Sequence, residues 1–257
     1  MNEQNEKITG DGRMKSPFLT WVENFWYHHK WPFLAGLLAL VVLTVSLVQC
    51  VGNGRGNDSA VMYAGGYTLM GTVARDFEGT VASFSEDSNG DGRILVGIGT
   101  YAIYTNAEIN EKYKDDSTRA QVKQSSHSNR EAFDQEILAG EATLCFLSPA
   151  LFEEVVGSEL ETDDGGKLNR FLPVGEYADL PDEALVLYRG TGYGIRLSAL
   201  NLAGYPGFSE LPEDTILCIR RNMSLNSIFG GKGAEAMYEA NLALAKRLIA
   251  APAYEVE

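Results

Sequence analysis

A stretch of nineteen residues without a charge, residues 33–51, constrains this chain more than any other part of its sequence. As an α-helix it would reach about 28 Å at ~1.5 Å per residue, close to the ~30 Å hydrocarbon core of a bilayer. A buried helix of a globular domain normally shows polar positions within such a length. The sequence therefore predicts one transmembrane helix at residues 33–51, a cytoplasmic tail at residues 1–32, a linker at residues 52–59 and an extracytoplasmic domain at residues 60–257.

The residues around this segment predict its orientation. Before it stand Arg13, Lys15 and Lys30, whereas within a comparable distance after it there is only Arg55. Lys and Arg concentrate on the cytoplasmic side of membrane segments, and aromatic residues form belts at the lipid headgroups. All three tryptophans, at positions 21, 26 and 31, precede the segment. We therefore expect a single pass through the cell membrane, with the N-terminus in the cytoplasm and the C-terminal domain extracellular.

The length of the leader favours a retained signal anchor over a cleaved signal peptide. Thirty-two residues precede the apolar segment and no small-residue cleavage site follows it, whereas a secretory signal has a short charged leader and a shorter apolar core. The alternative is a lipid on Cys50, because residues 47–50 resemble a bacterial lipoprotein box. Glutamine at position 49, in place of the expected small residue, argues against it.

The tail before the segment predicts an amphipathic juxtamembrane helix. Ser16-Pro17 supplies an N-cap followed by proline at the first helical position. From there, Phe18, Trp21 and Phe25 recur at helical spacing. Such a helix lies at the inner membrane surface or binds a partner.

The net charge of −14 lies entirely outside the N-terminal part. Residues 1–51 hold four basic and four acidic side chains, so residues 52–257 carry the whole excess of acid. Such a surface repels phosphate backbones, and we expect no nucleic-acid partner. The remaining length, about 200 residues, is enough for one domain or two small lobes.

Three cysteines are too few for a disulfide scaffold. Cys145 and Cys218 each lie in an apolar, strand-like run, where a free buried thiol is the usual state. A bridge between Cys145 and Cys218 would require the two strands to be neighbours. The sequence leaves this pairing open.

Alternating strand and helix patterns beyond residue 60 predict an α/β domain. Apolar residues at helical spacing predict helices at residues 69–84 and 234–251, and Ser148-Pro149 predicts a further helix start. Residues 128–131 (Ser-Asn-Arg-Glu) match a capping box, while the polar stretch before them fits a loop or a partly helical excursion. Short apolar runs predict strands at residues 60–64, 93–98, 143–147, 185–188 and 215–219. This order predicts a mixed or mainly parallel sheet covered by helices.

The sharpest local motif is Asp87-x-Asn89-x-Asp91-Gly92, which matches the first half of an EF-hand calcium loop. Its three side chains supply oxygens at positions one, three and five, and glycine at six allows the turn. A complete loop needs a bidentate carboxylate at position twelve, where this chain has Ile98. The metal-site candidates are therefore Asp87, Asn89 and Asp91 with calcium. The alternative is a surface turn without a cofactor, since tight turns select the same residue types.

No pattern in the sequence predicts a catalytic centre. The part beyond residue 60 holds one histidine, His127, and lacks the G-x-S-x-G elbow, the H-E-x-x-H zinc motif and the Walker lysine pattern. Residues 190–194 (Gly-Thr-Gly-Tyr-Gly) lack the third glycine spacing of a dinucleotide fingerprint, and we expect a flexible or tightly turned crossing between lobes there instead. Arg220-Arg221, at a strand end, fits an anionic ligand, solvent or a nearby carboxylate. Carboxylates are abundant and single out no acid–base pair.

Residues 131–144, with the sequence EAFDQEILAGEATL, resemble part of the bacterial extracellular solute-binding proteins. In that family a helix ends in a small-residue turn and leads into a strand, followed by a loop and a helix at the cleft. Ser148-Pro149 and the helix through Phe152 occupy that place here. The aromatic N-terminus also resembles membrane-tethered extracytoplasmic proteins of Gram-positive bacteria, especially clostridia. The resemblance covers residues 60–160 and implies an α/β architecture, and it transfers no ligand-binding residue.

These patterns predict a membrane-anchored extracytoplasmic domain that binds and does not catalyse. Its expected partners are the membrane and either a small-molecule solute or a protein of the cell envelope. The alternatives are a membrane-tethered hydrolase acting on envelope material through carboxylates, and a structural scaffold of the envelope. A cleft between helix N-termini and strand ends favours binding, whereas two inward carboxylates at ~5–10 Å favour hydrolysis.

Overall fold

The chain divides into two compact units, Met1–Arg55 and Gly56–Glu257. The computed structural model describes residues 17–52, 57–161, 166–177, 179–222 and 231–255, and inside the first helix its described side chains lie between residues 18 and 44. Predictions for residues 1–16, for residues 53–56 and for the side chain of Cys50 fall outside this description.

The first unit contains one long helix, α1 (Pro17–Gly52), with Pro32 inside it. Aromatic rings follow one another along this helix. Phe18 stacks on Trp21 with 6.4 Å between ring centroids, and Trp21 stacks on Phe25 with 5.6 Å. The aromatic series predicted from the helical spacing therefore lies on one continuous helix.

The predicted transmembrane segment, residues 33–51, falls within α1. Its described side chains reach from Phe33 to Thr44, and they are exposed. Among the residues that the structure describes, no helix has both the length and the apolarity needed to cross a membrane.

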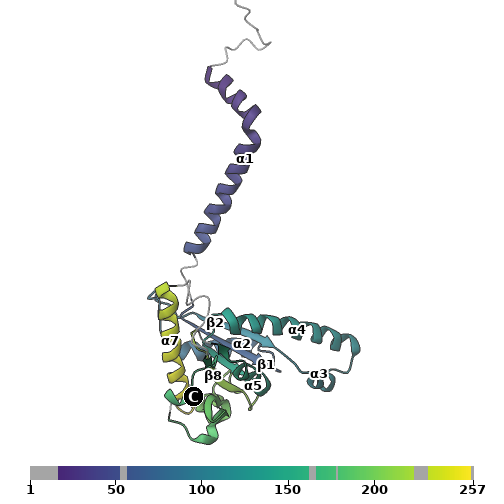
Figure 1. The fold of residues 1–257 in the computed structure, drawn as a ribbon, viewed down its shortest axis with the longest axis vertical. Helices are drawn as coiled ribbons and strands as arrows, with labels where there is room; N and C mark the ends of the chain where they lie inside the picture. Colours follow the sequence, from purple (N-terminus) through teal and green to yellow (C-terminus); the bar gives the residue numbers. More distant parts are fainter. Residues whose placement is uncertain (1–16, 53–56, 162–165, 178, 223–230, 256–257) are drawn as a thin grey trace, which may run out of the picture. The chain divides into compact units, whose positions relative to one another are not determined.

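The second unit is built on a six-stranded mixed sheet with the strand order β2-β1-β3-β8-β7-β6 (Figure 1). The strands are β1 (Ser59–Gly65), β2 (Val96–Ala102), β3 (Leu144–Leu147), β6 (Leu185–Tyr188), β7 (Thr191–Arg196) and β8 (Ile216–Ile219). β1 pairs in parallel with β2 and β3, and the pairings beyond β3 are antiparallel. A separate two-stranded ladder joins β4 (Leu160–Glu161) and β5 (Lys167–Leu168). The predicted α/β class with a mixed sheet is confirmed.

Helices cover both faces of this sheet. On one face, buried side chains pack against α2 (Gly71–Phe84) and α7 (Gly231–Ile249). On the other face they pack against α4 (Asp116–Ala139) and α5 (Pro149–Gly157). The chain crosses from β1 to β2 through α2 on one face, and from β2 to β3 through α4 on the other. The second crossover runs across the sheet in the opposite direction to the first, so two right-handed crossovers must use opposite faces. The unit is a three-layer α/β/α structure.

The other described helices are short. α3 (Asn106–Lys112) precedes α4, and in Figure 1 these two helices extend beyond the sheet within their unit. Four 3₁₀ turns follow β5, namely η1 (Val174–Glu176), η2 (Asp182–Ala184), η3 (Leu197–Ala199) and η4 (Asn201–Gly204). Buried Leu197 and Leu202 join η3 and η4 to the core under α2 and α7.

The predicted strands and helices match β1, β3, β6, β8, α2, α5 and α7 within a few residues, whereas the strand predicted at residues 93–98 begins three residues later and ends four residues later, as β2. The helix start predicted at residues 128–131 is wrong, because these residues lie inside α4. This helix begins at Asp116, where the Asp115 carboxylate accepts a hydrogen bond of 2.7 Å from Thr118 N. A capping box does occur, but Thr105 and Glu108 form it at the start of α3.

β6 and β7 form a hairpin. Arg189 (φ 51°) and Gly190 (φ 83°) close it, and two successive residues with positive φ suit the right-handed twist of paired strands. The predicted crossing between lobes at residues 190–194 is therefore wrong, since this segment turns back into β7 of the same sheet.

Cys145 of β3 and Cys218 of β8 lie directly opposite each other in neighbouring strands. Both are free thiols without exposed surface. Burial raises the pKa of Cys145 to about 12 and that of Cys218 well above its ordinary value. The two strands are neighbours, as a disulfide between these cysteines would require, but no disulfide joins them.

Asn241 joins α7 to the start of β1. Its side chain has no exposed surface, accepts a hydrogen bond of 3.1 Å from Ala60 N and donates one of 3.3 Å to Thr143 Oγ1. Thr143 N in turn donates to Ala60 O at 3.2 Å. A buried amide with both functions paired costs little and fixes the helix on the sheet.

Arg220, at the end of β8, holds the C-terminus of α4. The residue is 6% exposed, and its guanidinium donates to four backbone carbonyl groups. These belong to Glu136, Ile137, Gly140 and Ala142. Helix C-termini carry partial negative charge on their free carbonyl groups, so a cation is stabilised there. The sequence led us to expect an anion, solvent or a carboxylate as the partner of Arg220. Backbone carbonyl groups take that place instead.

Asp58, directly before β1, organises the turn between α2 and β2. The residue is 1% exposed, and its carboxylate accepts hydrogen bonds from the backbone N–H groups of Ser88 (2.8 Å), Asn89 (3.2 Å) and Leu95 (2.8 Å). Burial raises the pKa of Asp58, but these hydrogen bonds outweigh it and hold the pKa below its ordinary value. One buried carboxylate therefore sets the entry into β2.

Replacing Asp58 with Asn is expected to lower the free energy of unfolding by about 1–3 kcal/mol. Both carboxylate oxygens accept N–H groups, so either orientation of the new amide would place its NH₂ against a donor. Because the folded-state pKa is depressed, Asp58 contributes stability at neutral pH that is lost as pH falls through that pKa. The variant should therefore lose less stability on acidification than the native chain.

Urea unfolding followed by far-UV circular dichroism measures both effects. Tryptophan fluorescence would not, since all three tryptophans lie in α1. The exposed Glu78 of α2 provides the control, because Glu78→Gln should change stability by less than ~0.5 kcal/mol. Equal acid sensitivity of the native chain and the Asp58→Asn variant would contradict the role of this carboxylate.

Candidate functional site

The carboxyl ends of β1, β2 and β3 meet at one edge of the sheet. After β1 the chain passes to α2 on one face, and after β3 it passes to α5 on the other. Ligands of doubly wound sheets bind in the crevice between two such strands. Here the crevice is narrow, because a Cβ on Gly65 would lie 2.8 Å from the Tyr63 hydroxyl and 3.2 Å from Ser148 Cβ. Ser148-Pro149 begins α5 as predicted, without a side-chain capping bond.

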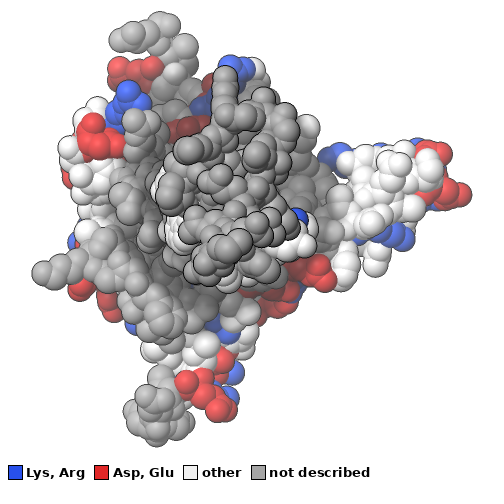
Figure 2. All heavy atoms as spheres, turned by 90° about the horizontal axis from the view of Figure 1, so that it is seen from above, with Lys and Arg blue, Asp and Glu red and all other residues white. Residues whose placement is uncertain are grey.

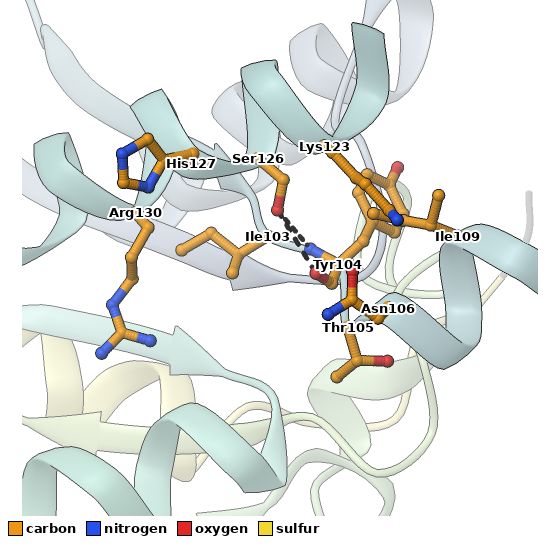
Figure 3. Close-up of a pocket in the computed structure, with 9 residues that line it drawn as sticks. All are labelled: Ile103, Tyr104, Thr105, Asn106, Ile109, Lys123, Ser126, His127 and Arg130. Carbon is orange, nitrogen blue, oxygen red and sulfur yellow. Dashed lines mark hydrogen bonds between the residues drawn. The ribbon is translucent and has the colours of Figure 1, made fainter. Parts of the chain in front are cut away.

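A cavity of about 490 Å³ lies beside this edge, where the chain leaves β2 (Figure 3). One wall is the segment that leads from β2 into α3, and the other is a face of α4. The lining residues are Ile103, Tyr104, Thr105, Asn106, Ile109, Lys123, Ser126, His127 and Arg130. Small-molecule sites occupy roughly 300–1,000 Å³, so a small solute fits a hollow of this size.

Ser126 fixes the two walls against each other. Its buried hydroxyl accepts a hydrogen bond from Tyr104 N at 2.9 Å and donates to Tyr104 O at 3.3 Å, the dashed lines of Figure 3. Three residues further along α4, Asn129 donates to Ala102 O at 2.9 Å. The Tyr104 hydroxyl also shares a hydrogen bond of 2.7 Å with Thr68. These hydrogen bonds therefore connect the segments that follow β1 and β2 to α4.

Three side chains of α4, Lys123, His127 and Arg130, extend along the cavity at spacings of four and three (Figure 3). The Arg130 guanidinium is already paired, with Asp134 at 3.0 Å and with Glu154. His127 is largely exposed, and its Nε2 lies 3.5 Å from a carboxylate of the next turn. Among the described residues, Lys123 has no ion-pair partner. Its ammonium is the cation that a ligand in the cavity can reach.

The cavity lining contains Lys123, His127 and Arg130 and no acidic residue, although the chain as a whole has a net charge of −14. Figure 2, a view of the whole chain, shows several groups of Asp and Glu side chains near the outline of the molecule, with Lys and Arg side chains between them. Among the described residues visible there, no broad basic face stands out. An anion is therefore attracted to Lys123 by short-range contact rather than by a long-range field.

A second hollow, of about 360 Å³, shares Arg130 with the first. It lies between α4 and α5, and its apolar lining residues are Ile137, Leu138 and Val155. Arg170 closes it, and burial together with the charge of Arg220 lowers the pKa of Arg170. This hollow is more apolar than the first, and its Arg170 already donates from Nε to the carbonyl and the hydroxyl of Ser158, both at 3.2 Å.

The described residues that line the cavity show no activated nucleophile. The Ser126 hydroxyl is bonded to the backbone of Tyr104, and the adjacent His127 leaves α4 in another direction (Figure 3). Cys145 is fully buried with a raised pKa, so it remains a thiol. Within the described residues, no group of three or more His, Cys, Asp or Glu side chains is placed to hold a metal ion.

The calcium candidates Asp87, Asn89 and Asp91 lie together in the turn between α2 and β2. Asp87 accepts hydrogen bonds from the backbone N–H groups of Gly90 and Gly92, at 2.6 and 2.7 Å. Asn89 and Asp91 each accept from the N–H two residues further on, both at 2.9 Å. These oxygens therefore stabilise the turn itself, and calcium binding there stays a prediction.

Sequence reasoning missed Lys123, Ser126 and the exit of β2 as parts of one site. The spacing of Lys123, His127 and Arg130 places them on one helix face, a signal that depends on a helix through residues 116–139, whereas the sequence left residues 106–128 open between a loop and a partly helical excursion. The sequence did single out His127, which the structure places on α4 rather than in a loop.

Comparisons of the chain with models of protein families, with curated proteins and with solved structures found no match in any of the three. Function is therefore inferred from the residues and the geometry described above.

Replacing Ser126 with Ala is expected to lower the free energy of unfolding by about 1–2 kcal/mol, because Tyr104 N–H would lose its acceptor in a part-buried position. The adjacent Ser125 is exposed, and Ser125→Ala should stay within ~0.5 kcal/mol of the native chain. Urea unfolding gives the stability, and hydrogen exchange of the Tyr104 amide gives the local effect. Unchanged protection of that amide in the Ser126→Ala variant would show that this hydroxyl does not hold the wall.

Proposed function

We propose that this chain is a membrane-anchored, extracytoplasmic binding protein that holds a small polar solute carrying an anionic group and does not catalyse its reaction. The observation that carries the proposal is the cavity of about 490 Å³ beside the exit of β2. Lys123, which has no ion-pair partner among the described residues, supplies an ammonium, and exposed Thr105 and Asn106 supply hydrogen-bonding groups.

The lining supports recognition of a solute. A lysine ammonium binds a carboxylate or a phosphate as a point charge. The partly exposed Ile103 offers apolar surface next to these polar groups, the usual combination in small-molecule sites. A protein partner would instead need a surface of ~800 Å² on each side, so a hollow of this size favours the solute over the envelope protein.

The location is proposed from the sequence. The uncharged run at residues 33–51 and the basic residues before it support one membrane anchor with the N-terminus in the cytoplasm. The resemblance of residues 131–144 to extracellular solute-binding proteins supports the same role. Under this proposal, residues 57–257 meet their solute outside the cell membrane.

Binding is tested by calorimetric titration of the full chain in detergent with phosphate and with small mono- and dicarboxylates. If one of them binds, Lys123→Ala should weaken it about 10- to 100-fold, because a hydrogen bond to a charged group contributes ~1.5–3 kcal/mol. Lys114→Ala is the matched control, since Lys114 is an exposed lysine outside the cavity lining. The proposal is wrong if no anion of the panel binds, or if both variants bind it equally.

The membrane proposal is tested with alkaline phosphatase fused after Glu257 or after Lys30. This reporter needs disulfide formation and is active only outside the cytoplasm. We expect activity from the fusion after Glu257 and none from the fusion after Lys30. The reverse pattern, or release of the full chain from membranes at high salt, would overturn the anchor and its orientation.

A further inference from the structure

The outer edge of β2 is seven residues long and uncharged. β2 is an end strand of the sheet, and it pairs with β1 over seven consecutive positions without a bulge. Residues 94–105 contain neither a charge nor a proline. Ile94 and Leu95, directly before the strand, are 41% and 36% exposed. Proteins normally protect an edge strand with lysine, proline, a bulge or a covering segment, and the first three are missing here.

The hydrogen bonds of β2 show which backbone groups face outward. The carbonyl of Leu95 and the N–H of Ile103 both bond to β1. Successive residues of a strand direct their backbone groups to opposite sides, so Val96, Ile98 and Thr100 direct theirs away from β1. Among the described residues, no hydrogen bond pairs these outward groups.

α4 marks where the free edge ends. The next outward carbonyl, that of Ala102, accepts a hydrogen bond of 2.9 Å from Asn129. The free edge therefore consists of Val96, Ile98 and Thr100, with Ile98 at its centre. These three residues alternate along β2. They can pair with the same three residues of an identical antiparallel strand, so that the middle residue faces its own copy.

We propose that β2 pairs with β2 of a second copy of this chain, in antiparallel orientation and with the two-fold axis at Ile98. In this register Ile98 faces the partner's Ile98, and Val96 faces the partner's Thr100. These are hydrogen-bonded positions, so each free N–H and C=O of the three residues finds a partner. Two six-stranded sheets then form one continuous sheet.

The residues of β2 suit a copy of the same chain. In this register Gly97 faces the partner's Gly99 at a non-hydrogen-bonded position, where strands approach most closely, at ~4.5 Å between Cα atoms. Neither glycine carries a side chain that could collide there. The edge is also free of charge, so two chains of net charge −14 can meet without placing like charges opposite each other.

The test uses Thr100→Lys in the full chain, in detergent, with sedimentation velocity over a range of micromolar concentrations. Thr100 is exposed, and a lysine at an edge strand blocks pairing without disturbing a core. We expect the native chain to dimerise and the Thr100→Lys variant to dimerise about tenfold more weakly or not at all. The matched control is Leu187→Lys on β6, the opposite end strand, where Leu187 is 56% exposed. This variant should dimerise like the native chain.

Hydrogen exchange identifies the interface. The amides of Val96, Ile98 and Thr100 should become protected as the native chain dimerises and should stay unprotected in the Thr100→Lys variant. A monomeric native chain, a dimer insensitive to Thr100→Lys, or equal loss of the dimer in both lysine variants would overturn the proposal. Protection of these amides in the monomer would overturn it as well, since another segment of the same chain would then cover the edge.

Discussion

The arrangement around the cavity depends on one buried cation. Arg220 leaves the end of β8 and donates to the carbonyl groups that close α4, so the position of a strand determines where a 24-residue helix ends. α4 then runs back to the exit of β2, where Ser126 and Asn129 bond the backbone. Without Arg220, the C-terminal carbonyl groups of α4 would lose both hydrogen bonds and a compensating charge.

Strands β1, β3, β6 and β8 could be predicted from the sequence, since each is a short apolar run between turn residues, whereas β2 begins three residues later than predicted and β7 was not predicted as a strand. The sequence prediction failed where local signals compete. Residues 128–131 satisfy a capping box, yet they continue a helix, because Asp115 already caps it and Phe133 and Ile137 bury the following turns. Residues 190–194 contain three glycines, yet two of them lie in a strand, because the hairpin turn needs positive φ only at Arg189 and Gly190.

The candidate site could not be predicted in the same way, because two segments about twenty residues apart form it. Ser126 has meaning only opposite Tyr104, and Asn129 only opposite Ala102. The motif that the sequence made most conspicuous has a local role instead. Asp87, Asn89 and Asp91 bond their own turn, and Asp58, a residue that attracts no attention in the sequence, anchors that turn from β1. Sequence spacing can predict hydrogen bonds within one turn, whereas a cavity between two separate segments is recognised only in the folded structure.

The facing thiols of Cys145 and Cys218 give the sheet a built-in reporter. Both lie between two helical layers without exposed surface, and their raised pKa values leave almost no thiolate for a reagent to attack. A thiol-specific reagent can therefore modify them only after β3 and β8 open. The rate at which these two cysteines are modified, followed separately from Cys50, then measures how often the centre of the sheet opens.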